Sequence, residues 1–323
     1  MPPPARDGDG AYGEAMAIGG SRIYHVNSNC TDLPRSVAFY EALGLAPITR
    51  TVPSRPQPGG AFGLDEVAWD AWMLQGDCGY DGLSLDLLQW TVPPPTGRPP
   101  ATMWEPGFSR LVLTVPELDQ VLDVVGSHGG RLLAGPSPVI DPDGASVPTA
   151  MVADPDGVAL QLEDGDDTRI ARVVVNTVDL DESLAYYLDV LGLRLVGRWQ
   201  GASADGSLFG VEGSVEFSRA DVADSGSQFG VSLVQWHRPV APGPDDRRVR
   251  GANELGLFRM AWSTDDCARD EGVVRAAGSA PFAPTGELSV GDDLPLLRVL
   301  FWPGPDGECL ELIEVTSASG ALG

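Results

Sequence analysis

The sequence contains no lysine, and all 21 of its basic residues are arginine. This absence excludes a Schiff-base enzyme, a pyridoxal anchor and a Walker-type phosphate loop, because each of them needs a lysine amine. The four cysteines form no Cys-x-x-Cys pair, so we expect reduced, buried thiols in a cytoplasmic protein. No apolar run approaches the length of a membrane span and no hydrophobic targeting segment is found, so we expect no membrane partner.

Positive charge is scarce as well. The 46 acidic residues outnumber the 21 basic residues and give a formal net charge of −25. Nucleic acid and an anionic membrane surface would both be repelled by such a chain. We therefore expect a small-molecule ligand or substrate rather than nucleic acid, bound by a monomer or a homodimer.

The sequence contains one pattern that occurs twice. SVAFYEALGL at Ser36–Leu45 returns as SLAYYLDVLGL at Ser183–Leu193, and LLQW ending at Trp90 returns as LVQW ending at Trp236, 146 residues later. A near-constant offset over several such matches indicates a tandem duplication. Because duplicated sheet modules build clefts between their copies, a ligand is expected between modules.

Each half is itself a doublet of a strand, a helix and further strands. The first strand of each quarter is rich in β-branched or aromatic residues and precedes an acidic turn that starts a helix. These first strands are expected at Ile23–Asn29, Arg110–Val115, Arg172–Val178 and Arg259–Thr264. The acidic helix starts are expected at Asp32, Glu117, Asp179 and Asp265–Asp266. Apolar closing strands are expected at Leu83–Leu88, Val158–Leu162, Val231–Gln235 and Cys309–Ile313. The sequence therefore predicts an α+β fold of four βαβββ modules.

Composition suggests the domain limits. Residues 1–20 are rich in proline, glycine and aspartate and predict a disordered tail. Residues 21–165 are expected to form a first domain from modules 1 and 2, and residues 168–318 a second domain from modules 3 and 4. The acidic run Glu163–Thr168 is interpreted as the boundary between them. Linkers inside each pair of modules are expected at Pro93–Pro100 and Pro239–Asp246.

The order of these elements resembles the vicinal oxygen chelate superfamily. The resemblance rests on a strand, an Asp-Leu turn, a helix with adjacent aromatic residues, a Leu-Gly-Leu stop and a closing strand after Asp-Pro-Asp-Gly. That group includes glyoxalase I, bleomycin-resistance proteins, fosfomycin-resistance enzymes and extradiol dioxygenases. The resemblance covers Ser21 to about Val315 and implies that modules pair into two incomplete eight-stranded barrels around cavities. It is specific for the fold but not for an activity, because the superfamily includes enzymes and pure binders.

The resemblance also implies where a metal would be bound, since the enzymes of the group take ligands from one position on each first strand and each last strand. In this sequence those positions hold His25, Asp86, Arg110 and Gln161 in the first half, and Arg172, Ser232, Arg259 and Glu311 in the second half. A catalytic metal site usually needs three protein ligands, and arginine has no lone pair to give. We therefore expect no metal cofactor. If a divalent metal is retained, its ligands are expected to be His25, Asp86 and Glu311.

His25 and Asp86 are the candidate catalytic pair. A histidine oriented by a carboxylate can act as a general acid or base, and the alternatives are a remnant of a metal site or a structural, cavity-lining histidine. These two residues favour the first domain as the working one. Trp90 and Trp104 are candidate aromatic contacts for a flat ligand, with core packing as the alternative.

Arginine residues are the candidate ligand clamps. Arg110, Arg172 and Arg259 lie within apolar strands, where a buried guanidinium needs partners. Gln161 and Glu311 are expected to be two of those partners because they lie at facing positions. Each arginine is either half of a structural pair or a clamp for the carboxylate, phenolate or carbonyl group of a ligand.

These observations favour two functions about equally. One is a protein of the bleomycin-resistance type that binds a small aromatic or polyketide-like natural product without metal, for resistance, sequestration or biosynthesis. The other is a metal-independent isomerase, cyclase or lyase, with His25 and Asp86 as the base and an arginine that stabilises an oxyanion. A metal-dependent lyase or dioxygenase is the third alternative, so whether the protein is an enzyme stays open at this point.

Overall fold

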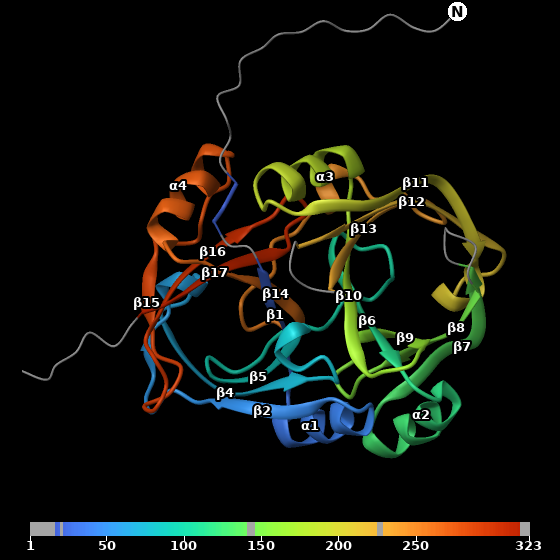
Figure 1. Ribbon diagram of the computed structural model, residues 1–323, viewed down its shortest axis with the longest axis horizontal. Coiled ribbons are helices and arrows are strands. Elements are labelled where there is room, and N and C mark those ends of the chain that lie inside the picture. The colour runs from blue at the N-terminus through green and yellow to red at the C-terminus, as the bar shows by residue number, and fades with distance from the viewer. Residues whose placement is uncertain (1–16, 20–21, 141–145, 225–228, 317–323) are drawn as a thin grey trace, which may run out of the picture.

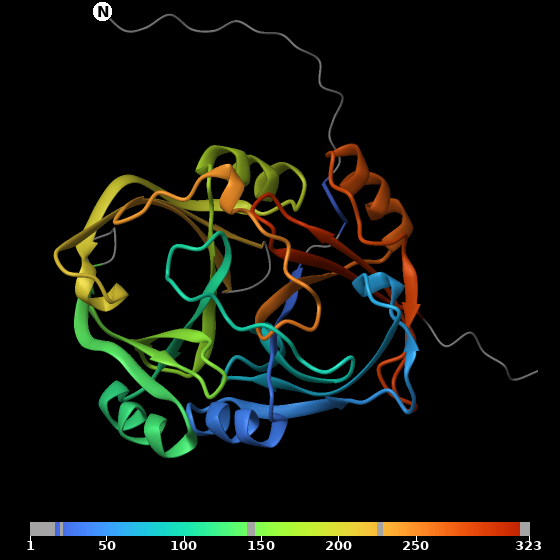
Figure 2. The same ribbon diagram turned by 180° about the vertical axis from the view of Figure 1, so that it is seen from behind.

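Two curled sheets lie side by side in the computed structural model, which describes residues 17–19, 22–140, 146–224 and 229–316 (Figure 1). Each sheet bends into an incomplete barrel. The α-helices of these described residues lie outside the sheets, with α1 and α2 on one side of the molecule and α3 and α4 on the opposite side (Figures 1 and 2). None of these helices is long and apolar enough to cross a membrane.

The first half of the chain forms two βαβββ modules. Module 1 consists of β1 (Arg22–Asn29), α1 (Leu33–Ala42), β2 (Ala46–Thr51), the two-residue β3 (Gln57–Pro58), β4 (Glu66–Gln75) and β5 (Ser84–Val92). Module 2 consists of β6 (Gly107–Val115), α2 (Leu118–Val125), β7 (Arg131–Ile140), β8 (Ser146–Ala153) and β9 (Ala159–Asp164). The predicted first and closing strands are present in both modules, with ends that differ by a few residues.

The second half repeats this order. Module 3 consists of β10 (Arg169–Asn176), α3 (Leu180–Asp189), β11 (Arg194–Asp205), β12 (Ser214–Ala223) and β13 (Gly230–Arg238). Module 4 consists of β14 (Gly256–Ser263), α4 (Cys267–Ala276), β15 (Gly286–Leu288), β16 (Leu297–Pro303) and β17 (Cys309–Val315). The predicted α+β fold of four βαβββ modules, paired into two incomplete eight-stranded barrels, is confirmed.

Each sheet combines modules from different halves of the chain. The nine-stranded sheet has the order β15-β16-β17-β14-β1-β5-β4-β2, with β3 beside β4, and joins module 4 to module 1; we call it barrel 1. The eight-stranded sheet has the order β11-β12-β13-β10-β6-β9-β8-β7 and joins module 3 to module 2; we call it barrel 2. In both barrels the modules meet through their first strands, which pair antiparallel as β1 with β14 and β6 with β10.

The expected pairing of modules, 1 with 2 in residues 21–165 and 3 with 4 in residues 168–318, is therefore wrong. The run Glu163–Thr168 does not separate two sheets, because it leads directly from β9 to β10 of barrel 2. The predicted linkers Pro93–Pro100 and Pro239–Asp246 connect barrel 1 and barrel 2 instead. The physical reason is that the first strands of all four modules offer equivalent edges. The short connection after β9 keeps modules 2 and 3 in one sheet, whereas the two longer linkers let the chain cross to the other barrel.

The two modules of one half still meet, through a helix and a turn rather than through strands. Tyr40 on α1 donates a hydrogen bond to the Asp154 carboxyl of module 2 at 3.1 Å. Tyr187 on α3 donates to the Glu308 carboxyl of module 4 at 2.9 Å. Both tyrosines are fully buried. Hydrogen bonds therefore join the two modules within each half of the chain, and the two sheets join modules from different halves.

Side-chain caps fix the starts of three helices as the acidic turns predict. Asp32, Asp179 and Asp266 each accept hydrogen bonds from backbone N–H groups of the first helical turn. Glu117, before α2, makes no such bond and has a left-handed backbone with φ of 53°. The carboxyl of Asp164 takes over part of that role, because it accepts from the Leu118 N–H at 3.1 Å.

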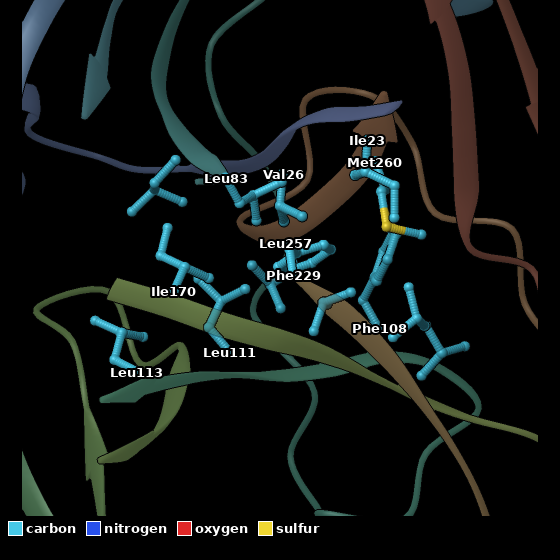
Figure 3. Packing of buried hydrophobic residues seen from close by; sticks show 14 of the residues in the cluster. Ile23, Val26, Leu83, Phe108, Leu111, Leu113, Ile170, Phe229, Leu257 and Met260 are labelled. Carbon is cyan, nitrogen blue, oxygen red and sulfur yellow. The ribbon is translucent and has the colours of Figure 1, made fainter. Parts of the chain in front are cut away.

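The main hydrophobic core lies where the central strands of the two sheets meet. Figure 3 shows Ile23 and Val26 of β1 and Met260 of β14 gathered with Leu111 of β6 and Ile170 of β10. All five side chains are at most 3% exposed. Side chains alternate between the two faces of a strand. The residues that precede Val26, Leu111 and Met260 in the chain therefore face into the barrels, and these are His25, Arg110 and Arg259. The same burial that joins the sheets therefore aims the candidate site residues inward.

The predicted disordered tail falls largely outside the described residues, which exclude 1–16 and 20. Residues 17–19 are described and are packed. Ile18 is 5% exposed and its N–H donates to the Val190 carbonyl at 2.9 Å, and the Gly19 N–H donates to Asp270 at 2.9 Å. For these three residues the expectation of disorder is wrong, because an apolar side chain is buried and two backbone groups find partners.

Candidate ligand sites in the two barrels

The strand register confirms the alignment of the four modules at the candidate positions. In each module the first strand pairs in parallel with the closing strand, and the closing-strand candidate lies two residues beyond the partner of the first-strand candidate. The four pairs related in this way are His25 with Asp86, Arg110 with Gln161, Arg172 with Ser232, and Arg259 with Glu311. The eight side chains therefore occupy equivalent places in two barrels.

The pairing of modules changes which of these residues lie together. Barrel 1 brings His25 and Asp86 of module 1 to Arg259 and Glu311 of module 4. Barrel 2 brings together Arg110, Gln161, Arg172 and Ser232. The expectation that His25 and Asp86 share a site with Arg110 and Gln161 is corrected, for the same reason that the expected domain pairing is wrong.

Arg259 occupies the centre of the candidate cluster in barrel 1. Its Nε donates to Glu311 Oε2 at 2.7 Å, and a terminal nitrogen donates to Asp86 Oδ2 at 2.8 Å. Burial alone would lower the pKa of Arg259, but the two carboxylates outweigh it and raise that pKa. Burial would likewise raise the pKa of Glu311, yet Arg259 and His25 hold it below its ordinary value. The cluster is a buried, charge-paired network.

His25 does not pair with Asp86. Its Nε2 lies 3.4 Å from Glu311 Oε2, a contact outside hydrogen-bond geometry, and neither ring nitrogen has a hydrogen-bond partner among the described residues. Asp86 is held instead by Arg259 and by the Asn27 amide, which donates at 3.2 Å. The predicted histidine–carboxylate pair of His25 and Asp86 is therefore not formed, because the arginine competes for the same oxygen.

A divalent metal does not fit the donor set of barrel 1. The three expected ligands His25, Asp86 and Glu311 converge, but the Arg259 guanidinium already binds both carboxylates within 2.8 Å. A metal ion there would have to displace a permanent cation from its buried partners. Within the described part of the chain, no group of three or more histidine, cysteine, aspartate and glutamate side chains is arranged to hold a metal.

Bulky side chains occupy the interior of barrel 1 around this network. They form a buried cluster that includes Phe62, Trp69, Trp90, Phe258, Leu288 and Phe301. The rings of Phe62 and Phe301 lie 4.5 Å apart, centroid to centroid, and the Arg259 guanidinium lies 5.9 Å from the Phe301 ring. His25, Asp86 and Arg259 are at most 6% exposed. The barrel that the sequence favours as the working one is closely packed.

Barrel 2 carries a chain of hydrogen bonds in the equivalent place. Arg110 Nε donates to Gln161 Oε1 at 2.9 Å, and the Gln161 amide donates to Glu163 at 2.7 Å. Glu163 also pairs with Arg172 of module 3. Ser232 donates to Asp221 at 2.8 Å. The predicted partnership of Arg110 with Gln161 is observed, and it brings further residues with it.

A cavity of about 570 Å³ opens inside barrel 2, and its inner wall includes Arg110, Gln161, Arg172 and Ser232. That volume is in the range of small-molecule pockets. The remaining wall is largely aromatic and aliphatic, with one further arginine. These residues include Trp199, Phe209, Phe217, Trp236, Val112, Val174, Val234 and Arg219. The cavity therefore joins flat apolar surfaces to several guanidinium groups.

Two residue differences contribute to the unequal interiors. Trp69, opposite Trp90 in barrel 1, corresponds to Phe217, opposite Trp236 in barrel 2. Phe301, opposite Glu311, corresponds to Met151, opposite Gln161. In both places the bulkier side chain is in barrel 1, which contributes to filling its interior.

The two predicted tryptophan contacts lie outside this cavity. Trp90 is 2% exposed in the barrel 1 cluster and donates to the Asn29 side chain at 3.0 Å. Trp104 lies in the segment before β6, packs against the apolar cluster that includes Trp236 and lines two other pockets. Trp236, the repeat partner of Trp90, lines the cavity together with Trp199.

Several wall residues were missed from the sequence. The LLQW and LVQW repeat could have indicated Trp236 as an alternative to Trp90. Arg219 and Asp221 lie two residues apart on β12, and Arg219 Nε donates to Asp221 at 2.7 Å. Such alternation is common in strands, so no sequence signal marks Arg219 or Phe209 as cavity wall.

The family match agrees with this architecture. Residues 22–162 match the model of the Glyoxalase/Bleomycin resistance protein/Dioxygenase superfamily. Glyoxalase I from Zea mays has the same fold, with a TM-score of 0.64 and 18% identity over 91% of this chain and 92% of the maize chain. A point mutant of that enzyme gives a TM-score of 0.62 and 18% identity, over 91% of this chain and 93% of the mutant chain. The resemblance is confirmed in sequence for residues 22–162, and the maize structures show the same fold over most of the chain.

A curated relative extends the comparison in sequence. Lactoylglutathione lyase GLX1 of Arabidopsis thaliana is 30% identical over 181 residues. The match covers 55% of this chain and 56% of the relative, so the chain spans about half the length of the curated relative that it matches.

Proposed function

We propose that this protein binds a small aromatic or polyketide-like molecule in the barrel 2 cavity without a metal ion, in sequestration, resistance or a biosynthetic step. One observation carries the proposal: arginine lies at both first-strand positions of barrel 2, beside an aromatic-lined cavity of about 570 Å³. A guanidinium cannot ligate a metal, but it can bind an oxygen of an organic ligand. Flat apolar walls with a few convergent polar groups are typical of sites for small organic molecules.

A metal-dependent lyase or dioxygenase is the alternative for this chain, and the plant relative is named a lyase. Barrel 1 is where such a metal would be expected, because His25, Asp86 and Glu311 converge there. Its Arg259 makes two short ion pairs with these carboxylates. Metal binding would require that buried arginine to leave its partners, so metal-independent binding is the better-supported function.

A metal-independent isomerase, cyclase or lyase with His25 and Asp86 as the base has less support from the geometry. Asp86 is engaged by Arg259, and both candidate residues lie in the filled barrel. In barrel 2, Glu163 and Asp221 are each engaged in an ion pair with an arginine. Binding in barrel 2 therefore ranks ahead of turnover.

The first experiment is elemental analysis together with native mass spectrometry of the same purified, chelator-free sample. We expect less than stoichiometric transition metal and, with added aromatic compounds, one bound molecule per chain. About one metal ion per chain would contradict metal-independent function. Failure to bind any aromatic compound from a panel of anionic, neutral and cationic members would contradict the binding function.

A variant in the cavity wall tests the location. Phe209→Ala removes a ring that lines the barrel 2 cavity and contacts Trp236 at a centroid distance of 5.2 Å. We expect it to weaken aromatic binding by roughly tenfold, on the scale of one aromatic contact. Phe282→Ala is the matched control, because Phe282 packs against the barrel 1 cluster. Equal weakening by both variants would contradict a site in barrel 2.

A further inference from the structure

The three arginines of the barrel 2 cavity differ in how their charge is balanced. Arg172 is paired with Glu163, and Arg219 with Asp221. Arg110 donates to the neutral Gln161, and no carboxylate of the described residues lies within ion-pair distance of it. Arg110 is nevertheless 6% exposed. A buried guanidinium with only a neutral acceptor is an uncompensated positive charge in the cavity wall.

The electrostatics of Arg110 agree with this imbalance. Burial, with the positive charges of Arg219 and Arg172 added, lowers the pKa of Arg110 to about 9, and the negative charge of Glu163 opposes this only in part. A negative group placed beside it would oppose all three effects. In barrel 1 the equivalent arginine, Arg259, meets two carboxylates of the chain itself. In barrel 2 the carboxylates Glu163 and Asp221 are paired with the other two arginines, so Arg110 has no carboxylate of the described residues in ion-pair contact.

The surroundings of Arg110 suit a flat ligand. The guanidinium carbon of Arg110 lies 5.6 Å from the Phe209 ring, and that of Arg219 lies 5.3 Å from the Trp199 ring. Phe209 and Trp199 also line the cavity. A planar group held between such rings would place an attached acidic group near the arginines.

We propose, on the basis of the proposed function, that the ligand of barrel 2 is an aromatic carboxylate whose carboxylate group binds Arg110. A guanidinium offers two parallel N–H donors that match a carboxylate, and the charge-assisted bonds are stronger than neutral ones. The same carboxylate supplies the counter-charge that Gln161 does not. The ligand's carboxylate therefore pairs with Arg110 in barrel 2 as the Glu311 carboxylate pairs with Arg259 in barrel 1.

The net charge of −25 does not oppose this assignment at contact distance. Surface charges more than a Debye length away, roughly 8 Å at physiological salt, are largely screened, whereas buried groups are screened much less. The cavity wall includes one carboxylate, Asp205, which is exposed and accepts from the Ser207 N–H at 2.8 Å. The arginines are the nearest charges to a ligand deep in the cavity.

The test compares 2-naphthoate with neutral 2-naphthamide by isothermal titration calorimetry and tryptophan fluorescence on the full chain. We expect naphthoate to bind roughly tenfold or more tightly than naphthamide, because of the charge-assisted bonds. Arg110→Gln should abolish that preference by weakening naphthoate alone. Arg50→Gln is the matched control, since Arg50 lies on β2 of barrel 1 with its side chain 54% exposed, and it should keep the preference.

Each outcome separates this inference from the proposed function. Equal affinity of the wild type for the two compounds would overturn the carboxylate assignment and leave aromatic binding intact, and this comparison needs no variant to fold. A preference that survives in Arg110→Gln would overturn the role of Arg110. Binding of neither compound would overturn the carboxylate assignment, and binding of a cationic or other neutral aromatic compound would then show that the proposed function still holds.

Discussion

Arg259 and Glu311 lie side by side on neighbouring parallel strands in barrel 1, with the arginine Nε 2.7 Å from the glutamate Oε2. The equivalent pair in barrel 2 is Arg110 with Gln161, at 2.9 Å. The exchange of a carboxylate for an amide at one position changes a neutralised guanidinium into one whose charge remains available. The packed barrel and the hollow barrel therefore differ in chemistry mainly through this one residue, and less through their fold.

The ion pairs of Arg259 should matter for stability. We expect Arg259→Met to lower the free energy of unfolding by about 3–5 kcal/mol, because two buried carboxylates, Asp86 and Glu311, lose their counter-charge. Guanidinium chloride unfolding at pH 7 measures the loss. Arg50→Gln, which removes a surface pair with Asp70, should cost at most about 1 kcal/mol. A loss from Arg259→Met as small as in that control would show that the network contributes little.

The buried carboxyl of Asp154 should make stability depend on pH. Burial raises its pKa from 3.8 to about 6, although hydrogen bonds from Val158, Asp156 and Tyr40 oppose the shift. The folded state therefore holds this proton more tightly than the unfolded state. The resulting contribution to stability is complete below pH 3.8 and is lost as the pH rises through about 6.

Asp154→Asn should remove that loss, because the amide stays neutral and can still accept the two backbone bonds. Relative to the wild type, we expect the variant to gain about 3 kcal/mol between pH 4 and pH 7, from a shift of roughly two units. Urea unfolding at both pH values measures the gain. A difference between variant and wild type that is the same at the two pH values would rule out Asp154 as the titrating group.

The helix caps offer a paired comparison. Asp179→Ala removes the side chain that accepts from the Asp181 and Glu182 N–H groups at the start of α3, and should cost about 1 kcal/mol. Glu117→Ala, at the same position before α2, removes no cap bond and should cost much less. Thermal and chemical unfolding distinguish the two. Equal costs would mean that the cap bond is not the source of the effect.

The exchange of modules between halves predicts how fragments behave. If the chain is divided between β9 and β10, each half lacks the partner for the first strands that join its sheets. We expect neither half to give a folded monomer, and an equimolar mixture to recover the circular dichroism and the mass of the intact chain. Light scattering after size-exclusion chromatography measures the mass. A folded, monomeric half would contradict the observed pairing of β1 with β14 and β6 with β10.

The local features of this chain could be predicted because neighbouring residues decide them. Alternating apolar residues gave the first and closing strands of every module, and acidic turns gave the helix caps at Asp32 and Asp179. The positions that the resemblance implied for Arg110 and Arg259 are equivalent in the structure, as the matching register of their modules shows. A strand and its cap depend on contacts within about one module, so the sequence carries their signal directly.

The composition of the site could not be predicted in the same way. His25 was expected beside Asp86, but Arg259, 234 residues away in the chain, binds the same carboxylate. Phe209, Arg219 and Trp236 reach the barrel 2 cavity from segments that carry no distinctive motif. Each of these relationships joins residues that are remote in sequence, and nothing local distinguishes the correct partner from its repeat-related copies.

The sequence by itself determined the four βαβββ modules, the vicinal oxygen chelate fold and the identity of the residues at the former ligand positions. The tertiary structure alone decided that modules 1 and 4 share one barrel and modules 2 and 3 the other. It also decided that side chains such as Trp69 and Phe301 fill the first, while a cavity remains in the second. The physical reason is that equivalent strand edges can pair in more than one way. The lengths of the linkers select one pairing of the modules. The volumes of side chains from distant strands decide where a cavity remains.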